Sequence, residues 1–158
     1  MSVDATRHRL ISVDLDDESL APASRDQEQE RQIAIFDLLE ENHFAPDGAG
    51  GGPYALRLAL IEGRLAFDIQ GPGYQRRHLL SLSPLRGVVK DYHMICESYF
   101  QAIRNATPQR IETLDMGRRA LHDEGSLALQ KRLDGKVATD QDTARRLFTL
   151  ICALHWRG

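Results

Sequence analysis

The sequence has few of the residues that would stabilise a fold by covalent links or anchor it in a membrane. It contains two cysteines, Cys96 and Cys152, in 158 residues. Two cysteines make no disulfide framework, so we expect reduced thiols and a cytoplasmic protein. No apolar run approaches the roughly 20 residues that cross a bilayer, and acids stand where a signal peptide has its apolar region. We therefore expect no membrane partner and no export signal.

Complete catalytic motifs are also absent from the sequence. There is no Gly-x-Ser-x-Gly elbow, and neither cysteine follows a basic helix start that would lower its pKa. The glycine-rich segment 48–53 lacks the Lys-Ser/Thr pair that ends a phosphate-binding loop, and it leads into Pro53 and an expected strand. We interpret this segment as a flexible connection within the domain, and we predict no cofactor.

The composition predicts one globular domain over residues 1–158, because 42% of the residues are hydrophobic and 27% are charged. The charge is unevenly distributed. Residues 1–50 hold 12 acids and 4 arginines, whereas residues 51–158 hold 11 acids and 16 basic residues. The two halves either complement each other or form a dipolar surface for a partner. No aromatic residues interleave with the basic doublets, so we predict no nucleic-acid partner.

Hydrophobic periodicity predicts the order β-α-β-β-β-α-α-α. In the first strand, Ile11, Val13 and Leu15 are expected to face the core. A Glu62-Gly63 turn predicts a hairpin, and Leu80 and Leu82 indicate a third strand of the meander. Together these patterns predict an α+β fold, with a four-stranded antiparallel sheet and helices packed on one face.

The three C-terminal helices are predicted from apolar stripes and capping residues. Ser83 and Pro84 indicate the start of a helix that ends near residue 106, and its long apolar stripe predicts that it is the centre of packing. A second helix is expected from residue 108 to about 133. Thr139 and Asp142 are spaced as a capping box for a third, whose apolar last turns should be buried.

The second of these helices contains the stretch "LDMGRRALHDEGS", residues 114–126. At roughly 100° per residue, Arg118 lies on the apolar stripe of this helix, while His122 and Asp115 lie near the edge of the stripe and Glu124 lies on its other flank. An unpaired guanidinium is costly to bury, so Arg118 needs an anionic or carbonyl partner.

Two interpretations of this stretch remain open. In the first, Arg118 pairs with an acid on a neighbouring helix, such as Glu97 or Asp91, and stabilises the helical layer. In the second, Arg118 and His122 line a cleft that binds an anionic ligand, and Gly125 allows close approach of a backbone. The second interpretation makes Arg118, His122, Asp115 and Glu124 the candidate ligand-binding residues.

Two pairs of potential metal ligands stand at helical spacing. His93 and Cys96 form one pair, and Cys152 and His155 form the other. If the two helices touch, the four side chains match a tetrahedral zinc site. Both cysteines lie in apolar faces, where cysteine behaves as a small hydrophobic residue. We therefore predict no metal, with this set as the alternative.

Three long stretches of the sequence carry a family resemblance: "GVVKDYHMICESYFQAI", "LDMGRRALHDEGS" and "DTARRLFTLICALHWRG". Together with "RHRLISVDLD" and "AIFDLLEENHFAP", they resemble UPF0262, an uncharacterised family of small alphaproteobacterial proteins. The resemblance covers nearly the whole chain. It implies a single cytosolic domain and transfers no activity, cofactor or catalytic residue.

These observations lead to two functional hypotheses. The first is a non-catalytic, cytosolic binding or regulatory module for a protein or an anionic small molecule. The alternative is an enzyme that acts on an anionic small molecule beside Arg118 and His122, with Arg118 holding the anion and His122 transferring protons.

Overall fold

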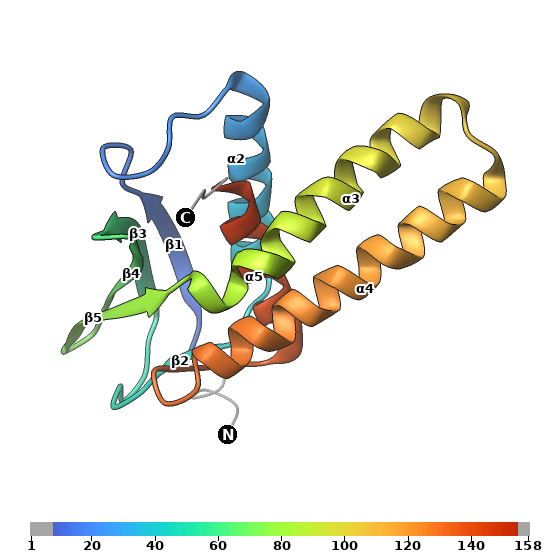
Figure 1. The fold of residues 1–158 in the computed structure, drawn as a ribbon. Coiled ribbons are helices and arrows are strands. Elements are labelled where there is room, and N and C mark those ends of the chain that lie inside the picture. Colours follow the sequence, from blue (N-terminus) through green and yellow to red (C-terminus); the bar gives the residue numbers. More distant parts are fainter. Residues whose placement is uncertain (1–7, 155–158) are drawn as a thin grey trace.

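The computed structural model describes residues 8–154 and shows an α+β fold with a sheet on one side and helices on the other (Figure 1). The α+β prediction is confirmed. Within the described range, no helix is both long and apolar enough to cross a membrane. The elements in chain order are β1 (Leu10–Leu15), α2 (Arg25–Glu40), β2 (Phe44–Pro46), β3 (Tyr54–Ile61), β4 (Arg64–Gly71), β5 (Tyr74–Ser81), the short 3-10 helix η1 (Ser83–Leu85), α3 (Arg86–Asn105), α4 (Pro108–Arg132), β6 (Val137–Thr139) and α5 (Gln141–Ala153).

The main sheet has the strand order β1-β3-β4-β5 and is mixed, so the prediction of an antiparallel sheet was wrong. β1 runs parallel to β3, whereas β3, β4 and β5 form the predicted antiparallel meander. The reason is that α2 lies between β1 and β3 in the chain. A helical crossover returns the chain to the end of the sheet at which β1 begins, so β3 runs in the same direction as β1. The predicted turn is present, with positive φ at Glu62 (51°) and Gly63 (78°).

A β-bulge changes which residues of β1 face the core. Leu10 pairs with Tyr54 and Ser12 with Ala55, which leaves Ile11 as the extra residue. Leu10 is fully buried and Ile11 is 58% exposed, so the prediction that Ile11 faces inward was wrong. A bulge reverses the alternation of side chains at one point, and simple period-two counting misses it.

A second, two-stranded sheet pairs β2 with β6 and was missed by the sequence analysis. Each strand has three residues, too few to show a periodic pattern. The glycine-rich segment 48–53 lies in the connection between β2 and β3. After β6, helix α5 is capped by Asp140, whose carboxylate accepts a hydrogen bond from the Thr143 backbone N–H at 2.9 Å. The predicted cap at Thr139 was therefore one residue too early.

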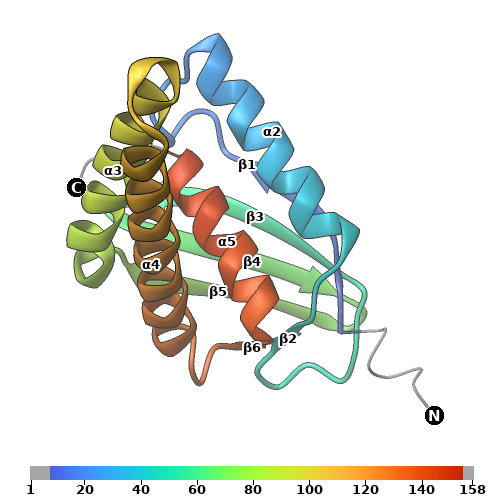
Figure 2. The ribbon, with the colours of Figure 1, turned by 90° about the vertical axis from the view of Figure 1, so that its right-hand side faces the viewer.

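The centre of the helical layer is α5, which lies between α2 and the α3–α4 pair (Figure 2). Eight of its 13 residues are buried, as its apolar last turns predicted. Helix α3 is not the centre of packing: Val89 and Ala102 are its buried residues, and α3 and α4 extend beyond the sheet as a helical hairpin (Figure 1). The part of the α3 apolar stripe that is far from the sheet therefore contacts α4 or faces solvent. The predicted start at Ser83 is a 3-10 turn, and α3 begins at Arg86 without a side-chain cap.

Candidate functional site

Arg118 bridges the two helices of the hairpin. Its Nη2 atom lies 2.5 Å from Oδ1 of Asp115 on the same helix, and its guanidinium carbon lies 4.9 Å from the centre of the Tyr99 ring on α3. The side chain is 33% exposed, so it lies at the boundary between core and solvent. The hydrogen bond with Asp115 raises the pKa of Arg118. Its carboxylate partner is thus on its own helix, rather than the expected Glu97 or Asp91.

His122 belongs to an adjacent cluster. Its Nε2 atom lies 2.7 Å from Oγ1 of Thr149 on α5, and its ring contacts those of Tyr92 and Phe148 at centroid distances of 5.4 Å and 5.3 Å. Burial lowers the pKa of His122, which keeps the ring neutral at pH 7. Glu124, the fourth candidate, is exposed. The structure thus places Arg118 and Asp115 where α4 meets α3, and His122 at the junction of α3, α4 and α5.

The anion-binding role of these residues stays a prediction. None of the three cavities that we describe within residues 8–154 is lined by Arg118, His122, Asp115 or Glu124. The contacts of Arg118 with Tyr99 and of His122 with Thr149 connect helices, whereas the acid paired with Arg118 lies on its own helix and not on a neighbouring one.

The lowered pKa of His122 predicts a pH dependence of stability. Burial is the largest cause, followed by the positive charge of Arg145. The unfolded chain therefore binds a proton more readily than the folded protein, and stability falls as the pH drops through the ordinary histidine value of 6.5. We expect the free energy of unfolding to fall less in His122→Gln than in the wild type between about pH 7.5 and about pH 5.5, measured by urea unfolding. Identical pH dependences would contradict this assignment.

The alternative metal set is only partly within the described residues. Nε2 of His93 lies 2.9 Å from the backbone oxygen of Cys152, so that nitrogen has a partner. Burial raises the pKa of both Cys96 and Cys152, which favours neutral thiols over metal-binding thiolates. Among residues 8–154, no group of three or more His, Cys, Asp or Glu side chains is arranged to hold a metal ion. His155 lies outside the described residues.

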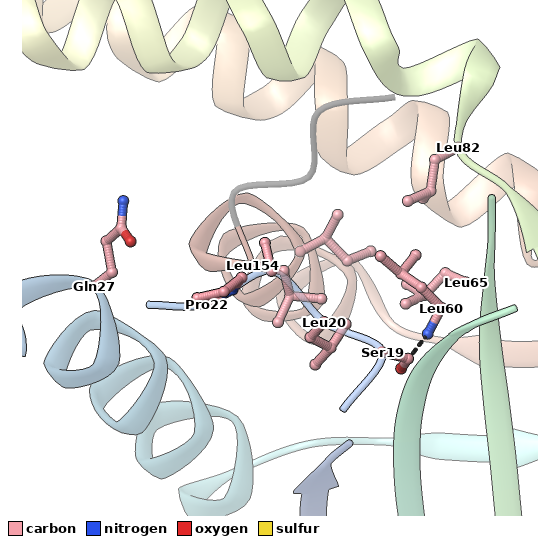
Figure 3. Close-up of a pocket in the computed structure, with 10 residues that line it drawn as sticks. Ser19, Leu20, Pro22, Gln27, Leu60, Leu65, Leu82 and Leu154 are labelled. Atoms are coloured by element: carbon pink, nitrogen blue, oxygen red, sulfur yellow. Dashed lines mark hydrogen bonds between the residues drawn. The ribbon is translucent and has the colours of Figure 1, made fainter. Parts of the chain in front are cut away.

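A cavity of about 510 Å³ lies between the β1–α2 loop, one end of the sheet and the C-terminal end of α5 (Figure 3). We call it the aliphatic cavity, because within the described residues its lining has only two polar side chains, those of Ser19 and Gln27. The main aliphatic side chains are Leu20, Leu60, Leu65, Leu82, Ile151 and Leu154.

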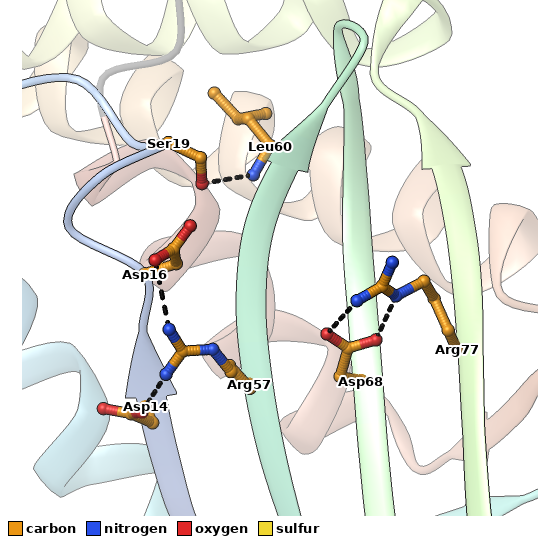
Figure 4. Close-up of polar contacts among 7 residues, drawn as sticks. All are labelled: Asp14, Asp16, Ser19, Arg57, Leu60, Asp68 and Arg77. Carbon is orange, nitrogen blue, oxygen red and sulfur yellow. Dashed lines mark hydrogen bonds and ion pairs between the residues drawn. The ribbon is translucent and has the colours of Figure 1, made fainter.

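Hydrogen bonds hold the walls of the aliphatic cavity in place. Ser19 Oγ accepts a hydrogen bond from the backbone N–H of Leu60 at 2.9 Å, which fixes the loop to the sheet (Figures 3 and 4). Arg31 of α2, which is 2% exposed, donates to the backbone oxygens of Ala21, Ala153 and Leu154 at 3.0–3.1 Å. Arg31 thereby joins the loop to the last turn of α5, whose carbonyls carry the negative end of the helix dipole.

The sequence analysis missed Arg31. Its signal is its spacing from Ala34 and Leu38, since all three lie on the buried side of α2. An arginine at i, with apolar residues at i+3 and i+7, lies on the inward-facing stripe of a helix. That pattern predicts a buried guanidinium that requires fixed acceptors.

Acidic residues adjoin two lining residues of the aliphatic cavity in the sequence. Asp17 and Glu18 precede Ser19, and Asp26 and Glu28 flank Gln27; all four acids are exposed. We call these four residues the acidic rim. Residues 14–30 contain seven acids and one basic residue, Arg25.

No helix of residues 8–154 covers the outer face of the sheet, which has a row of alternating charges (Figures 1 and 4). Asp14, Arg57, Asp68 and Arg77 stand opposite one another on successive strands. Arg57 pairs with both Asp14 and Asp16, and Nε of Arg77 lies 2.5 Å from Oδ1 of Asp68. A shallow cavity of about 760 Å³ follows this face. These opposite charges pair across neighbouring strands. The row therefore stabilises the sheet on its solvent-exposed face.

Comparisons with known proteins place the chain in a family. The sequence model described as "Uncharacterised protein family (UPF0262)" matches residues 7–157. A UPF0262 protein of Phenylobacterium zucineum is 72% identical over 96% of both chains, and one of Caulobacter vibrioides is 70% identical over the whole of both. A UPF0262 protein of Brucella canis is 58% identical over the full length of both chains. No solved structure shows a significant match. The chain belongs to the UPF0262 family, as its sequence resemblance implied.

Proposed function

We propose that this protein is a non-catalytic binding module and that the aliphatic cavity is its binding site. The observation that carries the proposal is a cavity of about 510 Å³ whose lining combines buried leucine and isoleucine side chains with the half-buried side chains of Ser19, Gln27 and Leu60. This volume lies in the range of sites that enclose small ligands or single anchoring groups, roughly 300–1,000 Å³. Its walls are held by bonds from Ser19 and Arg31 within the protein, which supports a preformed site.

The chemistry of the lining favours binding over catalysis. Ser19 accepts the N–H of Leu60, and the side-chain oxygen of Gln27 accepts the backbone N–H of Ser24 in the capping box of α2. Within the described residues, the lining contains no titratable side chain. Acid–base or nucleophilic catalysis requires such a group within reach of the ligand. The site is therefore suited to holding an apolar group.

A larger side chain at Leu60 tests this proposal. Leu60 is half-buried in the lining, so Leu60→Phe is expected to fill part of the cavity while the protein stays folded. We expect wild-type protein to bind 1-octanol saturably, with shifts of the methyl NMR signals of Leu82 and Ile151. We expect Leu60→Phe to weaken this binding at least about tenfold, because the apolar volume is lost.

The control is Leu79→Phe, the same change on the uncovered face of the sheet, where Leu79 is 39% exposed. This variant should bind 1-octanol as the wild type does. A wild-type protein that shows no saturable binding, or equal binding by the two variants, would overturn the proposal.

A further inference from the structure

We infer that the natural occupant of the aliphatic cavity is an aliphatic side chain of a partner protein, in a segment flanked by lysine or arginine. The inference rests on the proposed function and adds the identity of the partner. It follows from the adjacency in sequence of the acidic rim to two residues of the cavity lining. Asp17 and Glu18 adjoin Ser19, and Asp26 and Glu28 adjoin Gln27. Figure 3 shows Ser19 and Gln27 on opposite sides of the aliphatic lining.

The acids of the rim are exposed, and one of them, Glu28, accepts a hydrogen bond at Oε1 from Nε2 of Gln32 at 3.0 Å. Asp14 and Asp16 already pair with Arg57 on the outer face of the sheet (Figure 4). Asp17 and Asp26 are exposed. A basic segment that inserts an apolar side chain therefore meets negative charge on both sides of the entrance, which favours its approach and its orientation.

Among residues 8–154, the lining of the cavity offers no cationic side chain to an anionic ligand. The buried cation beside it, Arg31, donates from Nε and Nη2 to three backbone carbonyls of the protein. The lining itself supplies two uncharged polar side chains, Ser19 and Gln27, among the described residues. A free aliphatic molecule fills the cavity but leaves the acidic rim unused. A basic segment with an aliphatic anchor uses both features.

Three peptides test the inference directly. They share the core Leu-Ser-Ser-Leu and carry two lysines, two glutamates or two serines on each side, with blocked ends. We expect the lysine peptide to bind at least about tenfold more tightly than the glutamate peptide at about 20 mM salt, with the serine peptide between them. The difference should shrink severalfold at about 500 mM salt, because exposed charges are screened. The lysine peptide should also displace 1-octanol.

A charge-neutralising variant supplies a second readout that does not depend on core packing. Asp17→Asn with Glu18→Gln should weaken binding of the lysine peptide about three- to tenfold and leave 1-octanol binding unchanged. The matched control, Glu112→Gln with Asp134→Asn, removes one exposed acid from α4 and one from the turn directly after it, and should change neither.

The outcomes separate the inference from the proposed function. If 1-octanol binds while the lysine and glutamate peptides bind equally, the cavity is a binding site and the inferred basic partner is wrong. The inference is also wrong if the rim variant and the matched control bind the lysine peptide alike. If 1-octanol does not bind the wild type, the proposed function itself fails.

Discussion

Replacing Arg31 with methionine is expected to lower the free energy of unfolding by about 3–4 kcal/mol, because a charged donor with several buried acceptors is lost. Arg31 is 2% exposed and donates to the carbonyls of Ala21, Ala153 and Leu154. Methionine fills similar space but donates no hydrogen bond, so these carbonyls lose their partner away from water. The loop and the end of α5 then lose their connection, and we expect 1-octanol binding to weaken as well.

Two further variants show whether the geometry of the guanidinium is responsible. Arg31→Lys keeps the charge but offers a single ammonium in place of the planar fork, so it should recover only part of the loss. Arg25→Met removes an exposed arginine from the first turn of the same helix and should change stability by less than about 0.5 kcal/mol. Urea unfolding monitored by circular dichroism measures all three variants. Equal stability of Arg31→Met and Arg25→Met would show that the three hydrogen bonds of Arg31 contribute nothing.

Replacing Gly125 with alanine is expected to destabilise the protein by about 2–3 kcal/mol, although alanine favours helices by about 1 kcal/mol. A Cβ atom at Gly125 would lie 2.1 Å from Cζ of Phe148. Phe148 is fully buried and its ring contacts those of Tyr92 and His122, so it has little room to move. The close approach of α4 to α5 therefore depends on the absence of a side chain at residue 125.

The other helical glycines calibrate this effect. A Cβ atom at Gly87 in α3 meets no atom within 4 Å, so Gly87→Ala should stabilise the protein by about 0.5–1 kcal/mol. A Cβ atom at Gly117 would lie 2.6 Å from Cδ1 of Ile95, the mobile end of a flexible side chain, so its effect should fall between the two. If Gly125→Ala is as stable as Gly87→Ala in thermal unfolding, the packing of α4 on α5 is looser than the structure indicates.

The parts of the fold that the sequence predicted are those with a regular local pattern. The hairpin around Glu62 and Gly63 has alternating leucines and a turn that needs positive φ, and both are present. The parallel pairing of β1 with β3 has no local signal, because it depends on where α2 returns the chain. The bulge at Ile11 inserts one residue into one strand, and the period-two pattern of the sequence does not reveal this insertion.

The candidate site was less predictable for a related reason. Helical periodicity places Arg118 on the apolar stripe of α4, whereas its side chain is 33% exposed, and its stacking on Tyr99 depends on how α3 and α4 cross. The aliphatic cavity draws residues from the β1–α2 loop, the sheet and α5, which are far apart in sequence. The uneven charge was visible from composition, and only the fold brings Ser19 and Gln27, the sequence neighbours of those acids, to one cavity.

The most direct test of the aliphatic cavity as a binding site is a nuclear Overhauser measurement on methyl-labelled protein with the lysine-flanked peptide. The account predicts contacts between the peptide leucine methyls and the methyls of Leu65, Leu82 and Ile151, which lie together in the lining. Contacts confined to α3 and α4, or to the outer face of the sheet near Leu79, would contradict it.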